Sequence, residues 1–92
     1  MIIRDQFDPD LRKMIKKKKQ TAIIPVGSIE QHGPHLPIST DSDIVTEIAS
    51  KLSDSVKGIL FPTISYGISD EHFRFFILRI KMSTLSRILE DI

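Results

Sequence analysis

A segment dense in glycine, proline and histidine, residues 27–41, constrains the fold of this chain more than any other part of its sequence. It contains Gly27, Gly33, Pro34 and Pro37, so no regular element is expected to run through it. A loop of this length in a compact domain is usually functional or disordered, and its prolines favour a stiff loop of defined shape. We therefore expect the rest of the fold to be arranged around this loop.

Two short apolar segments and a helical pattern surround the loop. Residues 21–26 and 58–64 are rich in β-branched and apolar side chains and are typical of buried strands. Between them a helix is expected to begin at Thr40 or Asp41, with acidic residues in its first turns. Its expected apolar face consists of Ile44, Val45, Ile48, Ala49 and Leu52. Strand, loop, helix and strand form a βαβ unit, which predicts an α/β fold with a parallel sheet and helices on its faces.

The two ends of the chain each carry a further helical pattern. Asp8 is expected to cap a helix with Pro9 at its first position and Lys16 to Lys19 in its last turn. A polar loop at residues 66–72 and a weak strand pattern at residues 73–82 follow the second strand. A last helix is expected to be capped by Ser83, and its apolar positions have helical spacing: Leu85, Ile88, Leu89 and Ile92.

Length and composition exclude several classes of protein. With 92 residues and a formal net charge of +1, the chain is expected to form one small domain over residues 1–92 and no general nucleic-acid binder. It has no cysteine, which excludes disulfide scaffolds, thiolate metal sites and cysteine nucleophiles. No apolar run approaches the roughly 18–20 residues of a membrane span, and residues 1–10 lack the apolar core of a signal peptide. We therefore expect a cytoplasmic protein with neither a nucleic-acid nor a membrane partner.

The loop carries side chains that could bind a metal ion. Glu30 and His32 are two positions apart, so both point to the same side of an extended segment. Asp41 lies at the start of the following helix, where the chain could fold back over the strand end. Glutamate, histidine and aspartate suit Zn²⁺, Mn²⁺ or Fe²⁺, and ligands of open α/β sheets collect beyond the carboxyl ends of strands. The spacing alone leaves metal binding and a purely structural loop both open.

The run from Pro25 to Pro37, followed by Thr40 and Asp41, resembles the N-terminal signature of the creatininase family, which consists of creatinine amidohydrolase-like metal enzymes. The segment at residues 62–72 looks like the next characteristic segment of that family. The resemblance extends over about residues 21–90. It implies that the chain corresponds to an incomplete, N-terminal part of a three-layer α/β/α fold.

The resemblance also implies a reaction and a set of site residues. The family hydrolyses C–N bonds of cyclic or linear amides with water activated by two divalent metal ions, which could be Zn, Mn or Fe. By this resemblance Glu30 would ligate one ion, His32 the other, and Asp41 both. His35 and His72 would be catalytic side chains, and Ser69 would contact a small-molecule amide substrate. The family forms oligomers, so a homo-oligomer is expected.

Two departures from the family pattern leave alternatives open. The family supplies a further His and Glu ligand from a segment beyond this point, whereas this chain has three histidines in total. In addition, residues 75–82 replace a turn that resembles Phe-Pro-Gly-Thr with bulky side chains, which cannot adopt the turn that glycine allows. We therefore expect a truncated or shortened amidohydrolase that holds two metal ions, one or none. The alternatives are an inactive metal-binding or interaction fragment of the family, and a small βαβ domain whose Glu and His are structural.

Overall fold

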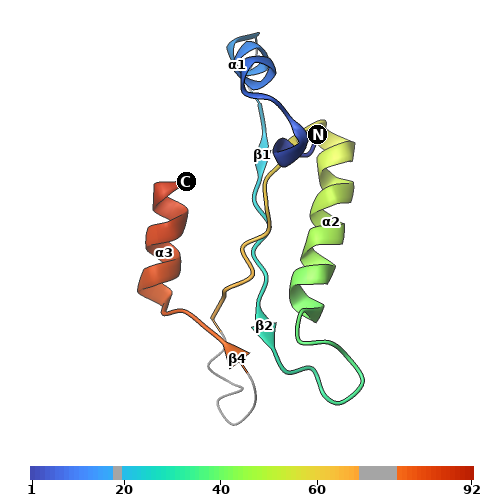
Figure 1. Ribbon diagram of the computed structural model, residues 1–92, viewed down its shortest axis with the longest axis vertical. Coiled ribbons are helices and arrows are strands. Elements are labelled where there is room, and N and C mark those ends of the chain that lie inside the picture. The colour runs from blue at the N-terminus through green and yellow to red at the C-terminus, as the bar shows by residue number, and fades with distance from the viewer. Residues whose placement is uncertain (18–19, 69–76) are drawn as a thin grey trace.

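The computed structural model describes residues 1–17, 20–68 and 77–92, and Figure 1 shows short strands with helices beside them. After a 3-10 turn at Ile3–Asp5, the elements in chain order are α1 (Asp8–Lys17), β1 (Ala22–Ile23), β2 (Ile29–Glu30), α2 (Thr40–Val56), β3 (Ile59–Leu60), β4 (Ile77–Leu78) and α3 (Met82–Asp91). This mixture of helices and strands, with a helical crossover between parallel strands, confirms the predicted α/β class.

The parallel pairing predicted from the βαβ order is present. Strand β1 pairs with β3 so that Ala22 lies opposite Ile59, and the two segments meet again, with the register shifted by one residue, at a parallel bridge between Val26 and Ile64. The other edge of β3 is occupied by the N-terminus, because Ile2 forms a parallel bridge with Leu60. The two apolar segments therefore run side by side. Residues 27–41 continue from the end of the first segment, at the edge where both segments end.

A second strand pair was not predicted. Strand β2 lies inside residues 27–41, where no regular element was expected, and it pairs antiparallel with β4. Residues 28–32 contain neither proline nor glycine, so a short extended stretch fits between Gly27 and Gly33. The weak strand pattern at residues 73–82 is confirmed at Ile77–Leu78, while residues 73–76 lie outside the described residues.

Helix α2 begins at Thr40 as predicted, but of its predicted apolar face Ala49 alone is buried. Its buried residues are Ser42, Ala49 and Ser53, all of them small. The predicted apolar face is largely in solvent, since Ile44, Ile48 and Leu52 are exposed by 54%, 60% and 48%. The cause is close packing: small side chains allow the α2 backbone to approach β2 and β3, which are its neighbours in the structure.

The caps of the terminal helices differ from the predicted ones, by one residue in α1 and by two in α3. The Phe7 carbonyl accepts the first helical bond of α1, from the Leu11 amide, so Asp8 is the first helical residue and its carboxylate accepts from Arg12 Nε at 2.9 Å. Helix α3 begins at Met82 with Lys81 as its cap, so Ser83 lies within the helix. Helix α1 ends at Lys17, and residues 18–19 of the lysine run lie outside the described residues.

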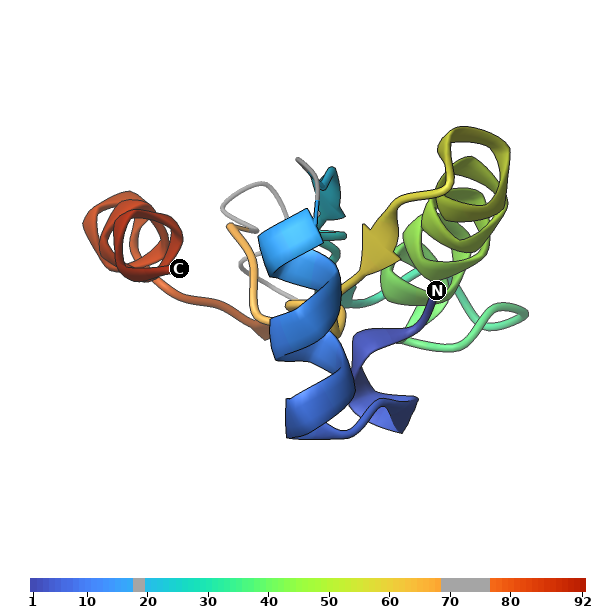
Figure 2. The same ribbon diagram turned by 90° about the horizontal axis from the view of Figure 1, so that it is seen from above.

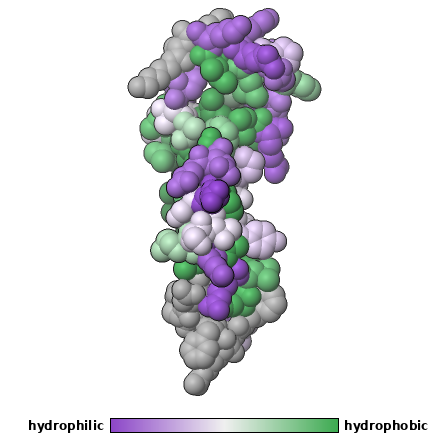
Figure 3. All heavy atoms as spheres, turned by 90° about the vertical axis from the view of Figure 1, so that its left-hand side faces the viewer, coloured by the Kyte–Doolittle hydropathy of each residue, from purple (hydrophilic) through white to green (hydrophobic). Residues whose placement is uncertain are grey.

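The chain is elongated and exposes much apolar surface. Figures 1 and 2 show α2 and α3 on opposite sides of the strands, and the radius of gyration is 15.6 Å, against about 12 Å for a compact chain of this length. The accessible surface is 7025 Å², against roughly 5,400 Å² for a compact monomer of this size. On the face drawn in Figure 3, green apolar surface flanks a purple, polar band. None of the described helices is long and apolar enough to cross a membrane.

Candidate metal centre

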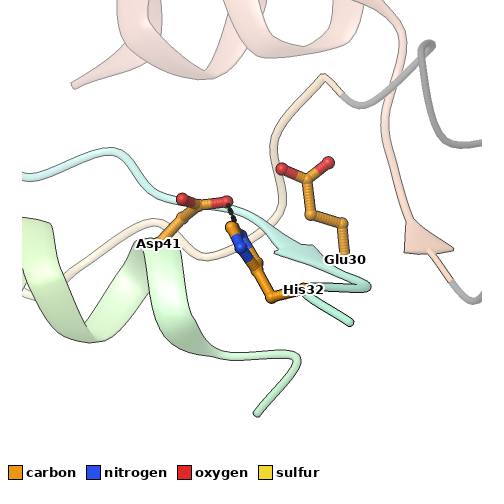
Figure 4. A group of neighbouring side chains, drawn as sticks. All are labelled: Glu30, His32 and Asp41. Atoms are coloured by element: carbon orange, nitrogen blue, oxygen red, sulfur yellow. Dashed lines mark hydrogen bonds and ion pairs between the residues drawn. The ribbon is translucent and has the colours of Figure 1, made fainter. Parts of the chain in front are cut away.

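Three side chains from two elements and the loop between them meet at one place. Glu30 is the last residue of β2, His32 follows two positions later, and Asp41 is in the first turn of α2. One ligand atom from each lies within 4.8 Å of those of the other two. Figure 4 shows the three side chains beside one another. The structure thus brings together the three residues whose spacing predicted that they would converge.

Backbone hydrogen bonds hold the two supporting segments in place. The Gly27 amide donates to the Ile64 carbonyl at 2.8 Å, which fixes the start of the loop against the end of the parallel pair. The Glu30 amide donates to the Ile38 carbonyl at 3.1 Å, so the loop closes on itself just before α2. This closure returns the chain to β2 and places the first turn of α2 beside Glu30.

The group is partly shielded from solvent and is dominated by negative charge. Glu30 is buried, with 8% of its surface exposed, and the side chains of His32 and Asp41 are exposed by 28% and 37%. The hydrogen bond from His32 Nε2 to Asp41 Oδ2, 2.8 Å long, lowers the pKa of Asp41. Partial burial opposes this shift, and a hydrogen bond from Ser28 adds to it. The two carboxylates repel each other, and a divalent cation bound between them would offset that repulsion. Together with the imidazole they form a set of ligand atoms suited to such a cation.

The sequence prediction gave no role to Ser28, which the structure places in direct contact with this group. Ser28 is 9% exposed, and its hydroxyl donates to Asp41 Oδ2 at 2.8 Å. The same Oγ lies 3.4 Å from Glu30 Oε1. Residues 28, 30 and 32 follow the same two-residue alternation, so the signal that predicted the convergence of Glu30 and His32 could also have predicted this serine.

The other predicted site residues are not part of this group in the described structure. His35 is exposed in the loop and does not belong to the cluster formed by Glu30, His32 and Asp41. Ser69 and His72, predicted to contact the substrate and to take part in catalysis, lie outside the described residues.

Comparison with known proteins gives one family and a set of relatives. The sequence profile of the creatininase family, described as creatinine amidohydrolase, matches residues 5–92. A mycofactocin precursor peptide peptidase from Mycobacterium tuberculosis (strain CDC 1551 / Oshkosh) is 41% identical over 63 residues, covering 58% of this chain and 25% of the relative. Proteins of the same description from Mycobacterium ulcerans (strain Agy99) and Mycolicibacterium smegmatis are 42% and 39% identical over 62 and 56 residues, covering 58% and 54% of this chain.

The chain is short compared with these relatives. It spans 25% of the length of the Mycobacterium ulcerans protein and 23% of that from Mycolicibacterium smegmatis. No solved structure gives a significant match.

Proposed function

We propose, because the chain belongs to the creatininase family, that Glu30, His32 and Asp41 hold divalent metal used to hydrolyse an amide C–N bond. The observation that carries the proposal is the convergence of one ligand atom from each residue within 4.8 Å. Two carboxylates and an imidazole, partly withdrawn from water, match the oxygen and nitrogen ligands that zinc, manganese and iron accept.

The proposed roles follow the family resemblance. Glu30 and His32 would each hold one ion, and Asp41, whose carboxylate has two oxygens, would be shared between them. When bound, such ions supply a water molecule of lowered pKa and polarise the carbonyl that it attacks. The chain itself contributes ligand placement and partial exclusion of solvent, since Glu30 is 8% exposed. We further propose that His35, His72 and Ser69 face the substrate.

The proposed substrate class is an amide, and two forms of it have support. The family profile is described by hydrolysis of creatinine, a cyclic amide. The relatives from mycobacteria are described as peptidases of a precursor peptide, whose scissile bond is a linear amide. In both substrates a C–N bond joins a nitrogen to a carbonyl carbon. The proposed centre would break this bond.

A second candidate function is metal binding without turnover. The described residues bring together three donor side chains, whereas the resemblance implies two further ligands, a His and a Glu. A site with three protein ligands and water could bind one ion and lack the second that the hydrolytic reaction uses. This candidate predicts a chain that is stabilised by metal and that leaves amides intact.

We also propose that the chain self-associates. It exposes 7025 Å², about 1,600 Å² more than a compact monomer of its size. Two chains that each covered this excess would bury about 3,200 Å² in total, which is within the range of obligate homodimers. Sedimentation velocity tests this proposal, because it predicts oligomers at micromolar concentration, and a monomer throughout the range would contradict it.

The test of activity uses the 92-residue chain and a matched variant. Metal-free chain would be given Mn²⁺, Zn²⁺ or Fe²⁺ in turn, with creatinine and with a short linear peptide as substrates. Metal-dependent hydrolysis by the wild type that Asp41→Asn lacks supports the hydrolase proposal. Metal binding with no hydrolysis of either substrate supports the second candidate, and a chain that neither binds metal nor hydrolyses an amide contradicts both.

A further inference from the structure

The hydroxyl of Ser28 contacts the metal-ligand group without belonging to it. Its Oγ lies 2.8 Å from Asp41 Oδ2 and 3.4 Å from Glu30 Oε1. A serine hydroxyl has one hydrogen to donate, so the shorter contact is the better bond and the longer one is a weaker alternative. The Ser28 hydroxyl is therefore directed chiefly at Asp41, the residue proposed to ligate both ions.

The backbone of Ser28 is itself held tightly against α2. The Ser42 hydroxyl donates to the Ser28 carbonyl at 3.0 Å, and this bond is buried. A Cβ at Gly27 would lie 2.6 Å from the Ser42 Cα, and one at Gly67 would lie 2.5 Å from the Gly27 carbonyl oxygen. These approaches exclude side chains at both glycines, so the segment before Ser28 lies between α2 and residue 67 with little room to shift.

Such a bond would restrain the carboxylate without consuming its capacity to bind a cation. Each carboxylate oxygen has two lone pairs, and the bonds from Ser28 and His32 both fall on Oδ2. Neither bond uses Oδ1, whose lone pairs can bind a cation while Ser28 holds Oδ2. A hydrogen bond to one oxygen limits rotation of the carboxylate plane about the Cβ–Cγ bond. A ligand oriented in advance loses less conformational freedom when the metal binds.

We propose that Ser28 is a positioning residue for the metal site and acts by orienting the Asp41 carboxylate through its hydroxyl. The inference rests on the proposed function, because it requires that Glu30, His32 and Asp41 bind metal. Ser28 would ligate no metal ion itself. It lies in the buried contact between the loop and α2 and would act through Asp41.

The experiment compares the metal affinity of the full 92-residue chain with that of three variants, using calorimetric titration of the metal-free protein with Mn²⁺. Ser28→Ala removes the hydroxyl, and Ser28→Thr keeps it. Ser53→Ala is the matched control, since Ser53 is 2% exposed and its hydroxyl donates to the Gly58 carbonyl at 3.0 Å, near the opposite end of α2. Circular dichroism of each variant reports whether it folds.

We expect Ser28→Ala to bind Mn²⁺ about 10- to 100-fold more weakly than the wild type, as for other outer partners of metal ligands. Ser28→Thr and Ser53→Ala should stay within about twofold of the wild type. Equal affinity of the wild type and Ser28→Ala overturns this inference alone, as does an equal loss in Ser53→Ala. A Ser28→Ala chain that fails to fold assigns the hydroxyl to folding and also overturns it. A wild type that binds no Mn²⁺, Zn²⁺ or Fe²⁺ overturns the proposed function together with this inference.

Discussion

Asp41 Oδ2 accepts two hydrogen bonds of 2.8 Å, one from His32 Nε2 and one from Ser28 Oγ. The first links the start of α2 to a loop residue nine positions earlier, and the second links it to a buried residue before β2. One carboxylate oxygen thus joins three segments of the chain. Several measurable consequences follow from this junction and from the packing around it.

The stability of the metal-free chain should depend on the ionisation of Asp41. Its pKa is lowered in the folded state, chiefly by the hydrogen bond from His32. The ionised form therefore contributes stability that is present above the unfolded pKa of about 3.9 and is lost as the pH falls through the lower folded value. Asp41→Asn should be less stable than the wild type near neutral pH, and the difference should shrink as the pH falls below about 4.

Urea unfolding of both proteins across this pH range measures that difference. Asp54→Asn, which removes an exposed carboxylate from the same helix, controls for the loss of charge and should show a smaller effect near neutral pH. A difference between the wild type and Asp41→Asn that stays constant down to the most acidic pH would contradict the assigned hydrogen bonds.

Gly27→Ala should destabilise the chain. Its new Cβ would lie 2.5 Å from Ser42 Oγ and 2.6 Å from Ser42 Cα, so either the loop or α2 must move. Overpacking of this kind typically costs about 1–3 kcal/mol, which urea unfolding can resolve. Ser55→Ala, at an exposed position of the same helix, should change the free energy of unfolding by less than about 0.5 kcal/mol. Equal effects of the two substitutions would contradict the close approach at Gly27.

The two faces of α2 should respond differently to substitution. Ala49 is 5% exposed, so Ala49→Leu forces a larger side chain into the contact with the strands and should cost about 1–3 kcal/mol. Ile48 is 60% exposed, so Ile48→Gln should change the unfolding free energy of a dilute chain by less than about 0.5 kcal/mol. The reverse order in urea unfolding would mean that α2 packs through its large apolar side chains instead.

Metal should stabilise the folded chain in proportion to its occupancy. If the site exists in the folded state alone, a free ion concentration about 100 times the dissociation constant raises the free energy of unfolding by about 2.7 kcal/mol. Thermal unfolding with and without Mn²⁺ measures the gain, and a chelator should remove it. Asp41→Asn should show little gain at the same concentration. A gain of similar size in that variant would place the metal elsewhere on the chain.

Local sequence patterns predicted the parts of the fold that depend on local rules. The helix beginning at Thr40 follows from acidic residues and apolar periodicity, and the convergence of Glu30 with His32 follows from two-residue alternation. The packed face of α2 could not be predicted in this way. Apolar periodicity predicted burial of Ile44 and Ile48 together with Ala49. The neighbouring strands approach closely enough to bury the small residues Ala49 and Ser42 and to leave both isoleucines exposed.

Local sequence patterns could not predict the antiparallel pairing of β2 with β4 either. Strand β2 is two residues long, and it is defined by hydrogen bonds to Ile77–Leu78, far away in the sequence. A segment this short has no periodicity that distinguishes it from a loop. Two-residue alternation can place Ser28 beside Glu30, but the role inferred for Ser28 depends on a tertiary contact, the bond of its hydroxyl to Asp41 on α2.

The most direct test of the account is calorimetric titration of Mn²⁺ into the metal-free wild type, His32→Ala and His35→Ala. Both histidines belong to the loop, but His32 contacts Asp41 at 2.8 Å and His35 is exposed outside the group. We expect that the wild type binds Mn²⁺, that His32→Ala weakens binding at least about tenfold, and that His35→Ala stays within about twofold of the wild type. Wild-type affinity in His32→Ala, or a wild type that binds none of Mn²⁺, Zn²⁺ and Fe²⁺, would contradict a metal centre at Glu30, His32 and Asp41.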